Sequence, residues 1–125
     1  MRLILIKQCP ICKTRQLKVT RISCDSCTLS VAGDIHVAPL ARLAGDDMRL
    51  AEALVLSGGN LKALAADIGI SYPTLRKRLD IVIARLKEER ERDERRMEEI
   101  LAEIEAGKID SETGIRLIRE IRHEQ

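Results

Sequence analysis

Apolar side chains recur every three or four residues in several stretches between residues 46 and 121, and this spacing predicts amphipathic helices. The first helix is predicted to start near Asp46-Asp47, because carboxylates suit a helix N-terminus, and to stop at Gly58-Gly59. Asn60 is suited to cap a second, short helix that ends at Gly69. These patterns predict a mainly α-helical chain.

A third helix is predicted to follow Ser71, a capping residue, with Pro73 tolerated in its first turn. Its apolar seam consists of Leu75, Leu79, Val82 and Leu86. From Lys87 to Arg96 every residue is charged, five of each sign, with opposite charges four residues apart. This run predicts a solvated helical connector over residues 87–96.

Two further apolar stripes are separated by Gly107 and Ser111, and they consist of Met97, Ile100, Leu101 and Ile104, and then Ile115, Ile118 and Ile121. They predict an antiparallel helical hairpin within residues 97–125. Such a hairpin is too small to be stable alone. We therefore expect it to serve in oligomerisation, a dimer being favoured, or in docking on a protein partner.

The N-terminal part has a different pattern. The stretches Leu17–Ile22 and Leu29–Val37 read as short strands, with Gly33-Asp34 marking a turn and Pro39 ending the region. The predicted architecture is mainly α with a small β zinc ribbon. Its parts are a ribbon (1–38), a helix-turn-helix domain (39–86), the charged connector (87–96) and the C-terminal hairpin (97–125).

The zinc prediction rests on two cysteine pairs, Cys9 with Cys12 and Cys24 with Cys27, each with two intervening residues and eleven residues between the pairs. Two such turns can surround one zinc ion with four thiolates, which leaves no open position for catalysis, so the site is expected to be structural. Iron in a four-cysteine site, disulfides and unremarkable thiols are the alternatives. His36 and His123 are each isolated in sequence and are not expected to be ligands.

Composition and charge refine this picture. The chain has no Phe or Trp, and Tyr72 is its only aromatic residue, which favours packing of aliphatic helices. Residues 1–86 carry a net charge of +6 and residues 87–125 a net charge of −4, so a basic front could meet phosphate. The opening Met1–Ile6 is too short for a secretory or membrane-spanning segment, and a cytoplasmic protein is expected.

The stretch Leu61–Asp80 has the pattern of a helix-turn-helix, with small Ala65 where the helices approach and Gly69 in the turn. The shared core is expected to contain Leu64, Ile68, Ile70, Leu75 and Leu79. The second helix would then expose the candidate DNA-binding residues Ser71, Tyr72, Pro73, Thr74, Arg76 and Lys77. An ordinary solvated basic face and a simple helix cap are the structural alternatives for these residues.

The order of motifs resembles an uncharacterised bacterial family with a domain-of-unknown-function label, which pairs a zinc ribbon with a helix-turn-helix. The matching stretches are Cys9 to Cys27, Pro39 to Leu43, Gly59 to Lys62, and Leu64 to Asp80. The helix-turn-helix is also similar to DNA modules of sigma factors and enhancer-binding proteins. The stretch Glu98–Ile121 resembles a helical hairpin of bacterial envelope-stress proteins, except that Gly114 stands where Ala is common.

The leading interpretation is a transcriptional regulator that binds double-stranded DNA through the helix after Ser71 and carries structural Zn²⁺. The alternative is a protein-interaction adaptor in transcription or envelope-stress signalling, with a polymerase or a sigma or anti-sigma partner and no direct DNA binding. RNA binding is disfavoured because stacking aromatics are lacking. An enzyme is not expected, because no catalytic triad, phosphate-cradling glycine loop or open metal site is found in the sequence.

Overall fold

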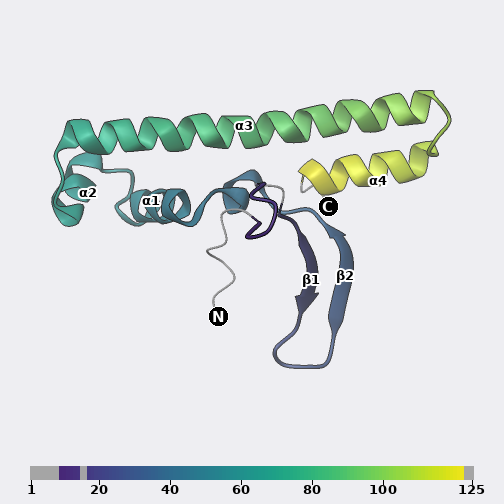
Figure 1. Cartoon of the computed structure of the whole chain (residues 1–125), viewed down its shortest axis with the longest axis horizontal. Coiled ribbons are helices and arrows are strands. Elements are labelled where there is room, and N and C mark those ends of the chain that lie inside the picture. Colours follow the sequence, from purple (N-terminus) through teal and green to yellow (C-terminus); the bar gives the residue numbers. More distant parts are fainter. Residues whose placement is uncertain (1–8, 15–16, 123–125) are drawn as a thin grey trace. The chain divides into compact units, whose positions relative to one another are not determined.

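The computed structural model describes residues 9–14 and 17–122. It is mainly helical with one small antiparallel sheet (Figure 1), and its elements are β1 (Val19–Ser23), β2 (Ser30–Ile35), a 3₁₀ turn (Pro39–Arg42), α1 (Gly45–Leu56), α2 (Leu61–Ile68), α3 (Tyr72–Glu105) and α4 (Ser111–Arg122). The described residues form two compact units. The first contains 39–91, and the second contains 9–14, 17–38 and 92–122, so α3 contributes to both. The opening Met1–Ile6 and His123 lie outside the described residues.

The core of the first unit lies where α1, α2 and the start of α3 meet. Leu64, Ala65 and Leu75 are buried together, and Leu75 has no exposed surface. The partly buried residues packed against them are Leu50, Ala53, Leu54, Leu61 and Ile70. Ile68, which the sequence placed in this core, is instead 41% exposed. It is the last residue of α2, so the end of that helix leaves the shared core.

Two long-range ion pairs hold the N-terminal part of this unit against α3. Arg85 donates from one guanidinium nitrogen to both carboxylate oxygens of Asp47, at 2.9 and 2.8 Å. Arg42 donates to the carboxylate of Glu89 at 2.9 Å and also to its main-chain carbonyl at 2.8 Å. Asp47 is buried, so losing its partner would leave a desolvated charge. The first pair links α1 to α3, and the second links the 3₁₀ turn to α3.

The sheet of the second unit is a two-stranded hairpin with Val19 opposite Ile35 and Arg21 opposite Ala32. Two residues, Gly33 and Asp34, therefore face the single residue Thr20, which makes a β-bulge. The prediction of a turn at Gly33-Asp34 was wrong, because both residues lie inside β2. Gly33 has φ 146°, a backbone conformation that a bulge and a turn both favour at glycine. The turn itself is formed by residues 24–29, which join the strands.

The C-terminal helices of the second unit form the predicted hairpin, with α4 lying beside the last turns of α3 (Figure 1). Asp110 caps α4, because its carboxylate accepts the N–H of Thr113 at 2.9 Å. Ile100 and Ile121 are buried, at 1% and 9% exposure. Gly114 is also buried, and a Cβ built there would lie 2.2 Å from Cδ1 and 2.7 Å from Cγ1 of Ile104. Glycine at this position therefore permits the close approach of the two helices.

Substitution Gly114→Ala is expected to destabilise the chain by about 1 kcal/mol, because overpacking costs more than the gain in helix propensity returns. The added Cβ must displace Ile104, so Ile104→Val, which removes Cδ1, should cost less in the Gly114→Ala background than in the wild type. Urea unfolding of the four proteins gives this coupling. Additive changes in the free energy of unfolding would contradict the close contact.

The charged run Lys87–Arg96 continues as helix within α3, and most of its residues are exposed. Two carboxylates depart from the predicted solvated surface. In the first unit, the side chain of Glu89 is 16% exposed and bound by Arg42. In the second unit, the side chain of Asp93 is 15% exposed and lies 3.4 Å from Nε2 of His36. Tertiary partners, which periodicity does not reveal, explain both departures.

Candidate functional site

The helix-turn-helix begins with two local caps. Asn60 accepts the N–H of Ala63 at 3.1 Å through its side-chain oxygen and caps α2. Gly69 ends α2 in the left-handed conformation at φ 79°, and the N–H of Ile70 then bonds the carbonyl of Ala65 at 3.1 Å. The hydroxyl of Ser71 accepts the N–H of Thr74 at 3.3 Å and starts α3. All three predicted caps are confirmed.

The connection between α2 and α3 is three residues long, a length typical of a helix-turn-helix. Leu75 anchors the first turn of α3 in the core. The six candidate DNA-binding residues around it are all exposed, and they are Ser71, Tyr72, Pro73, Thr74, Arg76 and Lys77. The structure therefore brings these six residues together on the outer part of one helix start.

Two local interactions modify this surface. The hydroxyls of Ser71 and Thr74 lie 2.8 Å apart and hydrogen-bond to each other, so each already has a partner. Arg76 forms an ion pair with Asp80 at 3.2 Å, one turn further along α3, and both side chains are at least half exposed. An exposed pair of this kind is weak, so Arg76 remains available to a phosphate. Asp80 was not predicted as the partner of Arg76, although the i,i+4 spacing indicates this ion pair.

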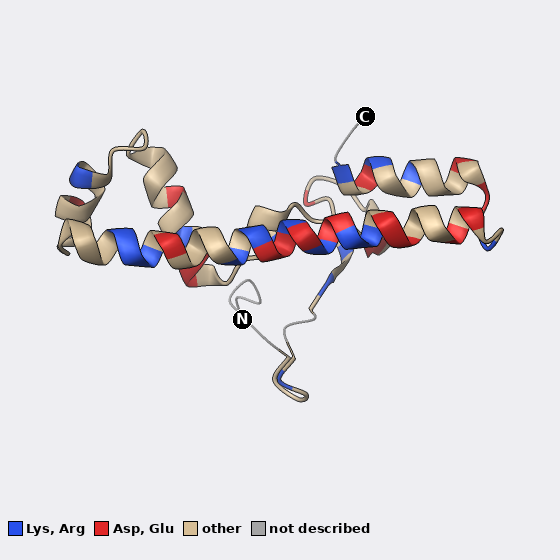
Figure 2. Cartoon of the chain, turned by 90° about the horizontal axis from the view of Figure 1, so that it is seen from above, with Lys and Arg blue, Asp and Glu red and all other residues tan. Residues whose placement is uncertain are grey.

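The basic residues at the start of α3 do not all face the same way. Figure 2 shows the basic segment near the beginning of α3, followed by the mixed acidic and basic run further along. Arg78 lines a pocket together with residues of α1, whereas Arg76 and Lys77 do not line it. Successive helical residues differ by about 100° in direction. The structure thus separates Arg78 from the two basic residues of the candidate DNA-binding surface.

The first cysteine pair lies in a tight turn. The N–H of Lys13 bonds the carbonyl of Cys9 at 2.9 Å, and the N–H of Cys9 bonds the carbonyl of Thr14 at 2.8 Å. Lys13 itself adopts φ 61°, the conformation for which glycine is usual. The hydroxyl of Thr14, 3.2 Å from Sγ of Cys12, contributes most to lowering the pKa of Cys12 to about 7, and the N–H of Thr14 contributes next. The turn therefore favours a thiolate.

The second pair occupies the loop between β1 and β2. The N–H of Cys24 bonds the carbonyl of Leu29 at 2.9 Å, and the N–H of Leu29 donates to Sγ of Cys27 at 3.5 Å. A backbone hydrogen bond from Ser26 is the main cause of the lowered pKa of Cys24. Amide donors directed at sulfur stabilise the charged form. This loop, like the first turn, has the donor chemistry of a thiolate ligand pair.

The two pairs are not assembled around a common point. Within the described residues, no group of three or more His, Cys, Asp or Glu side chains is close enough to share a metal ion, and the four thiols are free. A site with four thiolate ligands would therefore require the two cysteine turns to move together. His36 contacts Asp93.

The lowered pKa of Cys12 gives a test of the first turn. In chelator-treated protein, alkylation of Cys12 by iodoacetamide should reach half its maximal rate near pH 7, because the thiolate is the reacting form. Thr14→Val should move this midpoint upward, toward the ordinary value of 9.0, by removing the hydroxyl hydrogen bond. Mass spectrometry of the labelled peptide measures the rate at each pH. Thr28→Val, the matching change after the second pair, should leave the Cys12 profile unchanged, and an equal upward shift would argue against the Thr14 contact.

Comparison with known proteins adds one positive finding. Residues 43–89 match the profile of a family described as "Domain of unknown function (DUF2089)-HTH". No curated protein and no solved structure matches the chain. Within the part of the chain that the structure describes, no helix combines the length and apolarity needed to cross a bilayer. The matched range contains α1, α2 and the beginning of α3, and this part of the chain is similar to a helix-turn-helix domain of a domain-of-unknown-function family.

Proposed function

We propose that the chain is a transcriptional regulator that binds double-stranded DNA through the start of α3. The observation that carries this proposal is the exposed set of polar residues, Thr74, Arg76 and Lys77 with their neighbours, on a helix anchored by fully buried Leu75. A rigid helix start behind a three-residue turn is the arrangement that enters a major groove. The match of residues 43–89 to a family of helix-turn-helix domains supports the same function. The regulator is expected to act without enzymatic chemistry and in the cytoplasm.

DNA titration of the full-length protein tests this function. A duplex selected from random sequence should bind, and the logarithm of the association constant should fall steeply and linearly with the logarithm of the salt concentration, because bound phosphates release counterions. Fluorescence anisotropy measures both properties. Absence of binding to selected or genomic duplexes at low salt would exclude a DNA-binding regulator and favour the adaptor function.

A structural zinc ion is the second part of the proposal, with Cys9, Cys12, Cys24 and Cys27 as its ligands. Supporting it are the two tight turns, the amide donors directed at their sulfurs and the lowered pKa values of Cys12 and Cys24. When bound, the ion would supply the attraction that draws the two exposed turns together, since folding and metal binding are coupled in small ligand sets. Four thiolates saturate a tetrahedral ion, which accords with a structural role.

Dimerisation through the C-terminal hairpin is the third part. Leu101 and Ile115 remain 51% and 50% exposed after α4 packs on α3, and covering them would remove apolar surface from water. One helix-turn-helix makes few base contacts, so two copies on two half-sites give useful affinity.

The double change Leu101→Glu/Ile115→Glu should halve the mass measured by light scattering, because it places charges on the proposed interface. Both side chains are half exposed, so the fold should tolerate the change. Ala84→Glu/Ala106→Glu adds the same charge at two exposed positions of the same chain and should keep the full mass. An unchanged mass in the first variant would argue that another surface forms the oligomer or that the protein is monomeric.

An adaptor function has its own supporting observation. The first cysteine turn, the β1–β2 hairpin and the residues just before it expose several large apolar side chains, namely Ile11, Leu17, Val19, Ile22, Leu29 and Val31. Exposed apolar groups in one module are typical of protein interaction sites. A polymerase or a sigma or anti-sigma factor would be the partner in this alternative. Retained partner capture together with no DNA binding would favour it.

A further inference from the structure

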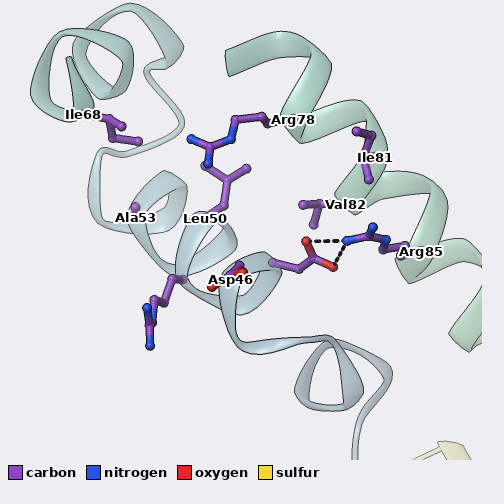
Figure 3. Close-up of a pocket in the computed structure, with 10 residues that line it drawn as sticks. Asp46, Leu50, Ala53, Ile68, Arg78, Ile81, Val82 and Arg85 are labelled. Atoms are coloured by element: carbon purple, nitrogen blue, oxygen red, sulfur yellow. Dashed lines mark hydrogen bonds and ion pairs between the residues drawn. The ribbon is translucent and has the colours of Figure 1, made fainter. Parts of the chain in front are cut away.

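A pocket of about 500 Å³ lies in the first unit. None of the proposed DNA-binding residues lines it. Residues of α1 form one wall, α3 forms the opposite wall, and Ile68 closes the end (Figure 3). Its apolar lining consists of Leu50, Ala53, Ile68, Ile81 and Val82. Ile68 and Ile81 are 41% and 50% exposed, so their side chains offer apolar surface to a ligand in the pocket. The volume falls in the range of small-molecule sites.

The charged side chains that line this pocket carry a net positive charge. The lining includes three arginines, Arg49, Arg78 and Arg85, and two aspartates, Asp46 and Asp47, which gives a net charge of +1. Asp47 is already paired with Arg85, which donates hydrogen bonds to both of its carboxylate oxygens. Arg78 extends from α3 toward Leu50 on α1 (Figure 3), and among the described residues no ion pair or hydrogen bond engages its guanidinium.

We propose that this pocket binds a small amphipathic monocarboxylate, with its hydrocarbon part against Leu50, Ile81 and Val82 and its carboxylate on Arg78. A planar guanidinium binds a carboxylate through two parallel hydrogen bonds, which favours this head group over a hydroxyl or an amine. A single negative charge also matches the net charge of the lining. The proposal does not depend on DNA binding, because Arg78 lies about 100° around α3 from Lys77.

Octanoate is a suitable probe because it is soluble, carries one charge and has a flexible apolar chain. Titration into the isotopically labelled full-length protein, followed by amide NMR spectra, should give saturable shifts centred on Leu50, Ala53 and Ile81. Octan-1-ol and octylamine, which share the chain and lack the carboxylate, should bind at least about tenfold more weakly, the difference expected for loss of one charged hydrogen-bonded pair.

Variants identify the carboxylate site. Arg78→Gln should weaken octanoate binding at least about tenfold and leave octan-1-ol binding unchanged, because the apolar wall remains. Arg90→Gln makes the same charge change at an exposed position of α3 outside the pocket and should bind octanoate like the wild type. Thermal unfolding of each variant in the absence of ligand checks that the fold is kept.

Three results would overturn the proposal. They are the absence of saturable shifts up to several millimolar octanoate, equal binding of octanoate and octan-1-ol, and full octanoate affinity in Arg78→Gln. Binding of an acidic amphipathic helical peptide without any binding of octanoate would identify the pocket as a protein-docking groove and exclude the small ligand. Absence of DNA binding by the wild type would leave these results unaffected, so the two proposals fail separately.

Discussion

The double substitution Arg76→Ala/Lys77→Ala is expected to weaken binding of the full-length protein to its selected duplex by about 10- to 100-fold, since one base or phosphate contact from each side chain is removed. Both side chains are exposed on α3 beside buried Leu75. The free energy of unfolding should change by less than about 0.5 kcal/mol for each site, as for other surface positions. Loss of the exposed Arg76–Asp80 pair adds little.

Anisotropy titrations at several salt concentrations separate the two kinds of contact. Each lost phosphate contact should reduce the salt slope by roughly 1, whereas a lost base contact should weaken the cognate duplex more than a scrambled one. Lys87→Ala/Arg90→Ala removes the same charge from exposed positions further along α3 and serves as the control. Unchanged affinity in the first variant, or an equal loss in the control, would refute the assigned surface.

The protein purified without added metal is expected to contain one zinc ion per chain, and Cys24→Ser should reduce this content to near zero. Removing one of four thiolates from a closed tetrahedral site costs much of the binding free energy, which is about 10–16 kcal/mol for structural zinc sites. Mass spectrometric metal analysis after dialysis against a weak chelator measures the content. Far-UV circular dichroism should change little, because the core around Leu64, Ala65 and Leu75 belongs to the first unit.

Ser26→Ala is the matched control, because it alters the same loop and keeps all four thiols. It should retain one zinc ion, and its cobalt-substituted form should retain the thiolate-to-metal absorption of the wild type. Cys24→Ser should lose this absorption. Zinc below half occupancy in the wild type with four thiols open to alkylation, or full zinc in Cys24→Ser, would refute the four-cysteine site.

Local interactions explain where sequence reasoning succeeded. Asn60, Gly69 and Ser71 each act on residues within about four positions of themselves, as a side-chain cap, a left-handed helix end and a second cap. Such interactions depend on residue type and spacing, so the limits of α2 and the start of α3 were predictable. The same holds for the buried seam of Leu75, Leu79 and Val82, whose spacing alone places it on one face.

Errors arose where one residue type serves two structures. A glycine with positive φ suits a turn and a bulge equally, and only the pairing of Arg21 with Ala32 decides for the bulge at Gly33. An isoleucine at the end of a helix can lie in the core or at the surface. Ile68 lines the pocket because α2 ends at this residue. For Gly33, the deciding partner is the neighbouring strand, which lies outside the local sequence.

By itself, the sequence determined the helix limits around the turn, the exposed set at the start of α3 and the two cysteine pairs, because these depend on spacing along the chain. Tertiary structure alone decided that Asp47 pairs with Arg85, 38 residues away, and that the side chain of Ile104 packs closely against Gly114. It also decided that Arg78 lines a pocket. The physical reason is that burial and ion pairing depend on which elements meet, whereas caps and periodic faces depend on neighbours within a few residues.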